Sequence, residues 1–444
     1  MQKKVLIIIL AYNAKTHIAK ILRHIPESLW NNPEYKAEIV IIDDCAHDKD
    51  CKDCLDVHVS LSDLNKPIFF LLSPVHLGYG GNQKMGYTYA IEHGYDIVVM
   101  THSDGRHPPE FLPEMIAPIL KGEADGVFGS HTIKKHEAIQ GGMPLYKFVR
   151  NFIITKLQNL VLGSKLTEFQ SGYRAYSVDA LKRLPFQHNS NTFDFDMDII
   201  IQFVNNKLVL KEISIPNYSG DDIRRINGIR YAFKVIRSSI ISRTQKYGIF
   251  YNPKFDYEHK LFYADKTGFA SSHHFAVSHV EDRQRVLDIG GGEGYVSEIL
   301  RKRGCLVTGC DWRVDDTMRA HYDAVYAMNL NHPDFTLLSS QHFDVIMLLD
   351  VIEHLLSPEE FMKQLHQWSV KGTTHILLTT PNIAFFVQRF MLLLGQFNYG
   401  KRGTLDMTHT RLFTFTSLKR LLTSTGYDII EMQGIPAPVL SNAK

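Results

Sequence analysis

The sequence has few cysteines, no long apolar run and almost no excess of charge. Its 444 residues include only 5 cysteines, which make no disulfide framework in a chain of this length and favour a reducing cytosol. No stretch of about 18 uncharged apolar residues occurs, so we expect no membrane-spanning helix. The 49 basic residues barely exceed the 47 acidic ones, which argues against bulk nucleic-acid binding.

Two further absences narrow the possibilities. Cys51 and Cys54 have the spacing of half a zinc site, but no second Cys/His pair lies at a suitable spacing to complete it. Because an apolar strand is predicted almost at the N-terminus and polar residues soon follow, we expect no signal peptide.

The length and the rhythm of the chain predict two domains. A chain of 444 residues exceeds one ordinary core. The sequence predicts alternating strands and helices over residues 1–245. This alternation is absent over 246–284, which is rich in aromatic and charged residues. The alternation restarts at Arg285. We therefore predict an α/β domain over 1–245, a linker with an entry helix over 246–284, and a second α/β domain over 285–444.

Short apolar runs in the first half are typical of strands buried on both faces of a parallel sheet. They cover residues 5–10, 37–42, 68–72 and 97–100. Such alternation predicts a doubly wound sheet, in which ligands bind at the carboxyl ends of the strands. Polar residues follow three of the runs and predict a site there: Tyr12, Asn13, Asp43, Asp44 and Asp104.

An ordered series of motifs over residues 1 to about 240 resembles the inverting family 2 glycosyltransferases with the GT-A fold. The closest branch is that of the polyprenyl- or dolichyl-phosphate sugar synthases. The motifs are Ala11–Asn13, Ile41–Asp48, His76–Gly86, His102–Glu110, Gly129–Pro144, Thr167–Tyr176 and Ile215–Asp222.

The resemblance implies a nucleotide-sugar site at the predicted strand ends. Asp43 and Asp44 would hold the base and the ribose, and Asp104 would approach the diphosphate through a divalent metal, Mg²⁺ or Mn²⁺. The implied binding residues are Ala11, Tyr12, Asn13, Asp43, Asp44, Ser103 and Asp104.

His102 and Arg106 depart from the family pattern, which is usually Asp-x-Asp followed two positions later by Gln. Imidazole binds Mn²⁺ acceptably, so His102 is a second candidate ligand beside Asp104. A guanidinium is always cationic and cannot ligate a metal. Arg106 would instead place its charge on the departing diphosphate, so a site that partly dispenses with metal stays open.

The acceptor in this branch is often a lipid phosphate, which is already an anion and needs no strong base. Arg174 and the pair Arg224 and Arg225 are candidates to bind it, and surface ion pairs are the alternative. A hydroxyl acceptor would need a carboxylate base such as Asp196 or Asp198.

Residues 145–162 have apolar side chains at helical spacing, with basic and polar residues on the other side. Such a helix can lie on an anionic membrane and deliver a lipid to the site, and packing on the sheet is the alternative. We expect a cytoplasmic protein that is peripheral to the inner face of the membrane. A polyprenyl phosphate is its expected lipid partner, and no protein partner is evident.

The segment Val286–Tyr295, VLDIGGGEGY, is the most informative motif of the second half. Glycine lets the backbone pass close to a ligand and tolerates the positive φ of a tight strand-to-helix turn. Asp311 ends the next apolar strand, where it can accept hydrogen bonds from a ribose diol. A βα turn without ligand and an NAD site are the alternatives.

From Arg285 to about residue 440 the chain resembles the class I S-adenosylmethionine-dependent methyltransferases. The strand end in Phe343–Leu355 (FDVIMLLDVIEHL) and the later Thr379–Asn382 (TTPN) favour the methyl donor over NAD. We expect Glu353 and His354 to open the next helix. The resemblance implies cofactor contacts at Asp288, Gly290, Gly292, Gly294, Asp311, Asn329, Leu330 and Asp350.

The segment Gly400–Thr414 resembles one found in methyltransferases that act on sugars, quinones and lipid-linked compounds. His409 would accept a proton from an attacking hydroxyl, since its ordinary pKa lies near working pH. Asp406 would orient it, and Arg411 would bind an anionic group. A purely structural His409 is the alternative, because methyl transfer depends largely on proximity and alignment.

The sequence therefore predicts a bifunctional enzyme in which one domain transfers a sugar and the other a methyl group. Both would serve one pathway, such as the synthesis of a methylated surface glycan or glycolipid of the cell envelope. The alternative is a methyltransferase localised by a degenerate, non-catalytic glycosyltransferase-like domain.

Overall fold

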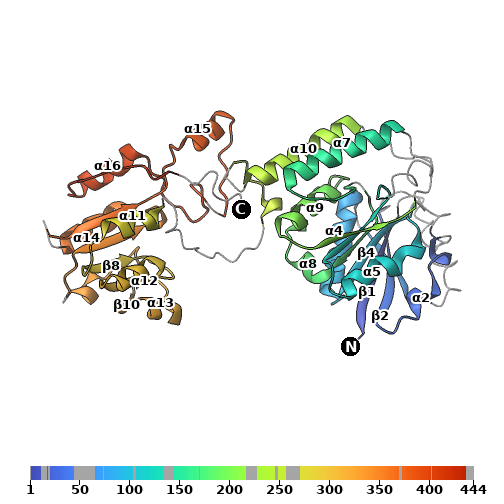
Figure 1. Ribbon diagram of the computed structural model, residues 1–444, viewed down its shortest axis with the longest axis horizontal. Coiled ribbons are helices and arrows are strands. Elements are labelled where there is room, and N and C mark those ends of the chain that lie inside the picture. Colours follow the sequence, from blue (N-terminus) through green and yellow to red (C-terminus); the bar gives the residue numbers. More distant parts are fainter. Residues whose placement is uncertain are drawn as a thin grey trace. The chain divides into compact units, whose positions relative to one another are not determined.

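The computed structural model in Figure 1 describes most of the chain. The described residues are 2–11, 18, 21–44, 66–73, 75–103, 107–133, 145–169, 171–216, 228–245, 249–256, 271–339, 341–369, 373–401 and 403–436. The chain forms two compact units, Met1–Lys246 with Asn252–Glu258, and Tyr247–Tyr251 with His259–Lys444.

The first unit contains a seven-stranded sheet with the order β3-β2-β1-β4-β6-β5-β7. The apolar runs expected to be strands all lie within it, and only their ends differ. One expectation needs correction, because β6 runs antiparallel to both of its neighbours. The strands are β1 Lys3–Ala11, β2 Tyr35–Asp43, β3 Ile68–Leu72, β4 Ile97–His102, β5 Gly126–Ser130, β6 Arg174–Ser177 and β7 Leu210–Ser214.

Alternate residues of β1 enter two different cores, which explains its uninterrupted apolar sequence. Leu6 and Ile8 join the core beneath one set of helices, and Ile7 and Ile9 join the core on the opposite face. The first core is covered by α4 Gly78–Glu92, α7 Leu145–Leu162, α8 Val178–Lys182, α9 Phe195–Asn205, α10 Gly228–Gln245, η3 Phe186–His188 and η4 Pro253–Phe255. The second is covered by α2 Glu27–Trp30, η2 Pro109–Phe111 and α5 Leu112–Leu120.

The helix expected over residues 145–162 is α7, with the expected bounds. It packs along α10, and Ile154 and Leu162 enter the core. The expected packing is therefore observed, while other apolar side chains of α7 remain exposed, with Leu160 at 80%, and its association with a membrane stays a prediction. This exposed apolar row consists of Val149, Phe152, Ile153, Leu157 and Leu160.

The second unit contains an all-parallel sheet with the order β10-β9-β8-β11-β12. Its strands are β8 Arg285–Ile289, β9 Leu306–Asp311, β10 Ala324–Ala327, β11 Val345–Leu349 and β12 His375–Thr379. Its helices are α11 Ser272–His279, α12 Tyr295–Lys302, α13 Asp316–His321, η5 Phe335–Leu338, η6 Ile352–His354, α14 Pro358–Trp368, α15 Phe386–Leu393 and α16 Phe415–Ser424.

Glu353 and His354 do not open a long helix, as the sequence suggested. They belong to η6, a short 3-10 turn that ends where Leu355 becomes extended. The next helix, α14, starts at Pro358, whose fixed φ suits the first position of a helix. Within the ranges described above, no helix has the length and apolarity needed to cross a bilayer.

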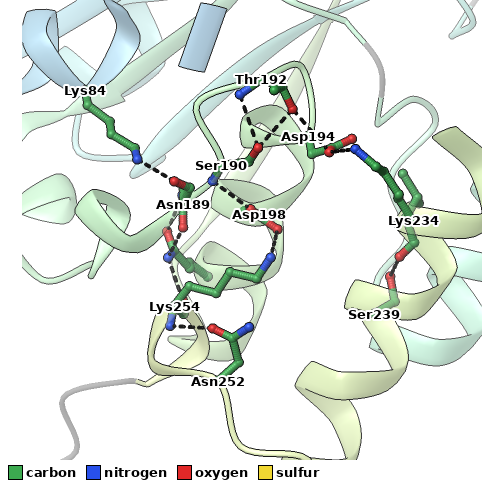
Figure 2. Close-up of polar contacts among 12 residues, drawn as sticks. Lys84, Asn189, Ser190, Thr192, Asp194, Asp198, Lys234, Ser239, Asn252 and Lys254 are labelled. Carbon is green, nitrogen blue, oxygen red and sulfur yellow. Dashed lines mark hydrogen bonds and ion pairs between the residues drawn. The ribbon is translucent and has the colours of Figure 1, made fainter. Parts of the chain in front are cut away.

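The segment after α10 is fastened to the first unit by a buried ion pair (Figure 2). Lys254 Nζ lies 2.8 Å from Asp198 Oδ1, and the Asp198 side chain is fully buried. Burial raises the pKa of Asp198, and the neighbouring Lys254 opposes that rise. Gln202 Nε2 also donates to the Lys254 carbonyl at 2.6 Å. Asp198, one of the candidate bases, therefore has a structural partner.

We predict that Lys254→Met destabilises the first unit by about 3 kcal/mol or more, because it leaves a buried carboxylate without its cation. Lys234→Met is the matched control, since Lys234 pairs with Asp194 but its side chain is 50% exposed. An exposed pair contributes at most about 1 kcal/mol. Urea unfolding followed by circular dichroism measures both variants, and equal losses would contradict the structural role of Lys254.

Candidate functional sites

The first candidate site lies at the edge where several parallel strands end. In the strand register Ala11 is paired with Asp43, and Leu10 is paired with His102. Ser103 follows directly, and its N–H donates to the Leu10 carbonyl at 3.1 Å. The structure thus brings Ala11, Asp43, His102 and Ser103 together, as predicted. Tyr12, Asn13, Asp104 and Arg106 lie outside the described residues.

Asp44 has structural partners that the sequence did not predict. Its carboxylate accepts the Leu77 N–H at 2.7 Å and the Gly78 N–H at 2.9 Å. N–H groups at the start of a helix such as α4 have no partner within the helix, and an anion is favoured there. His76 Nδ1 lies 2.9 Å from the same carboxylate, which is 5% exposed. Asp44 therefore holds the start of α4 against the end of β2, and the nucleotide contacts of Asp43 and Asp44 stay a prediction.

His102 is enclosed by aromatic neighbours. Its ring stacks on Tyr79, and its Nε2 lies 3.2 Å from the Tyr79 hydroxyl. That hydroxyl donates its only proton to Asp196 Oδ2 at 2.7 Å, so His102 Nε2 must be the donor of their contact. As a donor in this contact, His102 Nε2 has no lone pair to offer a metal ion. Asp196, the other candidate base, also accepts from Gln83 at 3.1 Å.

Arg174 is buried and cannot bind the acceptor of the sugar, which corrects its predicted role. The side chain is 1% exposed and donates from Nε to the Ser171 carbonyl at 2.8 Å. It also donates to the carbonyls of Phe169 and Asp196. Through these hydrogen bonds the guanidinium ties the segment before β6 to the start of α9. Arg174 is therefore a positioning residue, and the other candidates, Arg224 and Arg225, lie outside the described residues.

A pocket of about 360 Å³ adjoins this edge beside the end of β5, and its lining includes Phe152, Lys156 and Lys165. β5 is antiparallel to β6, which is antiparallel to β4, so β4 and β5 end at the same edge. The rings of His102, His107 and His131 are successive neighbours, and His131 directly precedes Thr132 of the pocket lining. The sequence did not predict this pocket, although its lining includes Thr132 and Thr167 from two of the motifs and several residues of α7.

The second candidate site is the glycine turn between β8 and α12. Gly290, Gly292 and Gly294 have φ values of +74°, +55° and +78°. A Cβ on Gly290 would lie 2.7 Å from a methyl group of Val351. A Cβ on Gly292 would meet no atom within 4 Å, so this glycine borders open space. The turn therefore fits a ligand that passes over Gly292.

Acidic residues surround the turn with different roles. Asp288 is buried beneath it and accepts from Ser297 Oγ at 2.7 Å and from the Tyr322 hydroxyl at 2.8 Å. Burial raises its pKa. Asp288 thus supports the turn and offers a ligand little direct contact. Asp311 is half-buried at the end of β9, 3.3 Å from the Gly292 amide nitrogen, where a ligand can reach it.

The other predicted cofactor residues also lie at strand ends of this edge. Asn329 is exposed and Leu330 half-buried just after β10, the neighbour of β9. Asp350 follows β11, the neighbour of β8, with a φ of +55°. Its carboxylate accepts from Thr379 Oγ1 at 2.8 Å and from Ser272 Oγ at 2.9 Å.

His409 lies beside His354, with ring centroids 4.8 Å apart. Its Nδ1 contacts the Thr404 carbonyl at 3.0 Å, so the predicted orientation by Asp406 needs correction. The Asp406 carboxylate instead accepts from the N–H and hydroxyl of Thr408. Arg411 forms an ion pair with Glu359 at 3.0 Å.

Two known families match the chain, one in each half. Residues 6–184 match the family model described as glycosyl transferase family 2, and residues 257–432 match a model described as methyltransferase domain. The first part of the chain thus resembles the family 2 glycosyl transferases, and the second part resembles methyltransferases. The predicted α/β folds, GT-A type and then Rossmann-like, are confirmed.

Individual relatives match one half each. A UDP-N-acetylglucosamine–dolichyl-phosphate N-acetylglucosaminyltransferase of Methanococcus voltae is 28% identical over 52% of this chain and 93% of its own length. A ubiquinone biosynthesis O-methyltransferase of Coxiella burnetii is 27% identical over 36% of this chain and 70% of its own. The solved glucosyl-3-phosphoglycerate synthase of Mycobacterium tuberculosis, in complex with Mn²⁺, uridine diphosphate and phosphoglyceric acid, is 15% identical. It matches 54% of this chain and 78% of its own, with a TM-score of 0.40.

We predict that Gly292→Val blocks the binding of S-adenosylmethionine. A branched side chain would fill the open space above the turn and resist its positive φ. Asp311→Ala should weaken binding more gently, by about tenfold to hundredfold, since a hydrogen bond to a charged acceptor contributes roughly 1.5–3 kcal/mol. Calorimetry on the whole chain, with NAD as the control ligand, measures both. Tight NAD binding without a response to S-adenosylmethionine would overturn the assignment.

Proposed function

We propose that the chain is a bifunctional transferase of surface glycan or glycolipid synthesis. The first domain would transfer a sugar from a nucleotide sugar to an acceptor, and the second would transfer the methyl group of S-adenosylmethionine to a substrate of the same pathway. The observation that carries this proposal is that each sheet has its own edge for a donor molecule. Asp43 and His102 flank the end of β1 in one sheet, and Asp311 lies beside the glycine turn in the other.

Polyprenyl phosphate is the acceptor that the first site favours. The pocket beside β5 offers Lys156 and Lys165 to a phosphate, and Phe152 belongs to both its lining and the exposed apolar row of α7. An isoprenoid chain could lie along this row while its phosphate points to the lysines. The Methanococcus voltae relative, named for a dolichyl-phosphate acceptor, supports this choice. The same row would let α7 rest on a membrane surface.

Sugar transfer would proceed with inversion in a single displacement. A phosphate oxygen of the acceptor forms a bond to the anomeric carbon, and the bond from that carbon to the nucleoside diphosphate breaks. Asp104, with His102 Nδ1 as a second ligand, would hold Mg²⁺ or Mn²⁺ at the diphosphate. Arg106 would add a positive charge to the leaving group and reduce the need for metal.

In the second domain the residues of the glycine turn would align the methyl donor with its acceptor. S-adenosylmethionine supplies an electrophilic methyl group when bound. Gly292 leaves room for it, Asp311 would accept hydrogen bonds from its ribose, and Asn329 with Leu330 would flank its adenine. The alternative, a first domain that only localises the methyltransferase, rests on the departures at His102 and Arg106.

The bifunctional proposal predicts that Asp104→Ala abolishes sugar transfer and leaves methyl transfer intact, because the two sites belong to different sheets. Nucleotide-sugar turnover with Mn²⁺ or chelator, and transfer of labelled methyl groups, measure the two activities on the same preparation. If wild type shows no nucleotide-sugar turnover under any condition, the localising alternative replaces the proposal.

The acceptor assignment predicts that Lys156→Glu/Lys165→Glu lowers transfer to polyprenyl phosphate by about tenfold or more, since two cations at the pocket become anions. Hydrolysis of the nucleotide sugar by water should persist, because the donor edge is untouched. Lys182→Glu on α8 is the matched control, with an exposed lysine outside the pocket. Equal transfer by the double variant and the control would remove the pocket from the proposal.

A further inference from the structure

Three potential metal-ligating side chains converge in the second unit. They are Glu353 and His354 of η6 and His409 of the segment that follows α15, so two separate parts of the chain contribute. One ligand atom from each lies within 4.8 Å of the other two. A cation at their centre would thus reach all three after small side-chain movements.

Both imidazoles are oriented as metal ligands commonly are. His354 Nδ1 contacts the Thr408 carbonyl at 3.1 Å, and His409 Nδ1 contacts the Thr404 carbonyl at 3.0 Å. A carbonyl oxygen only accepts, so each Nδ1 carries the proton and each Nε2 has a lone pair. Metal-ligating histidines almost always donate their other N–H in this way, which fixes the ring.

Glu353 supplies an independent sign of a ligand. The residue is 1% exposed, and its Oε2 accepts from Thr380 Oγ1 at 3.0 Å. Its Oε1 is buried and has no hydrogen-bond partner among the described residues. A buried carboxylate oxygen without a donor is costly, and coordination of a cation would compensate it. Burial and the neighbouring Asp350 also raise the pKa of Glu353 to about 8.

We propose that Glu353, His354 and His409 bind a divalent cation. Two imidazoles and one carboxylate favour a transition ion such as Zn²⁺, Co²⁺ or Mn²⁺ over Ca²⁺ or Mg²⁺, which prefer oxygen ligands. Three protein ligands also leave coordination positions for a further molecule, as catalytic metal sites do. The site differs from the one expected at Asp104 in the first half.

The cation would lie next to the methyl donor. Val351, two residues before Glu353, packs over Gly290 of the cofactor turn. An acceptor with an oxygen on the cation would therefore be close to the transferable methyl group, a step that rests on the proposed methyl transfer. His409 would then be a ligand that positions the acceptor, and its lone pair would not serve as the general base.

Cobalt binding by the whole chain tests the site, because Co²⁺ bound to imidazole absorbs visible light and needs no turnover. Wild type, His409→Ala, His354→Ala and Glu353→Gln are titrated with Co²⁺ after chelator treatment. His332→Ala, which changes an exposed histidine of the same unit, is the matched control. Asp104→Ala removes the candidate ligand of the first half. Calorimetry with S-adenosylmethionine verifies that each variant is folded.

We expect wild type, His332→Ala and Asp104→Ala to share a visible Co²⁺ band. Each ligand variant should lose the band and at least about tenfold in affinity, since even outer-shell partners contribute 10–100-fold. An unchanged band in His409→Ala that disappears in Asp104→Ala would overturn the proposal. Cobalt binding at Glu353, His354 and His409 without methyl transfer to any tested acceptor would support the metal site and count against the proposed function instead.

Discussion

The burial of parallel strands on both faces is the constraint on which the rest of the structure depends. A strand such as β1, whose side chains fill cores on both sides, cannot turn back directly into a parallel neighbour. Helices must make the return, so the carboxyl ends of the parallel strands in each sheet meet at one edge. Both candidate sites follow from this geometry, since β1, β2 and β4 deliver polar residues to one edge and β8, β9 and β11 to another.

This constraint also explains what the sequence could predict. Apolar runs predicted β1 to β4, and the polar residues after three of them predicted which side chains share an edge, whereas β5, β6 and β7 were not predicted. The positive φ values at Gly290, Gly292 and Gly294 agree with the glycine pattern. The helix α7 followed from its periodicity alone. The direction of β6 did not follow from the sequence, because a strand of four residues does not indicate whether it pairs parallel or antiparallel.

The contacts that the sequence did not predict belong to charged groups, most of whose partners are distant in the sequence. Asp44 and Asp43 are adjacent, yet only Asp44 meets the N–H groups of α4, some 30 residues away. Arg174 looked like an acceptor ligand because a sequence does not show that carbonyls from the preceding loop and from α9 enclose it. Likewise Asp406 is close to His409 in the sequence, but a backbone carbonyl orients the ring.

Compensation of buried carboxylates connects these observations. Asp198 has Lys254, Asp196 has Arg174, and Asp288 has two hydroxyl donors. Glu353 accepts from one side-chain hydroxyl, that of Thr380, and no ion pair between described residues includes it. Its raised pKa means that the folded chain holds the proton more tightly than the unfolded chain, so ionisation destabilises the fold as pH rises from about 4.5 toward 8. A cation held with His354 and His409 would favour the ionised form and reduce this cost, as Lys254 does for Asp198.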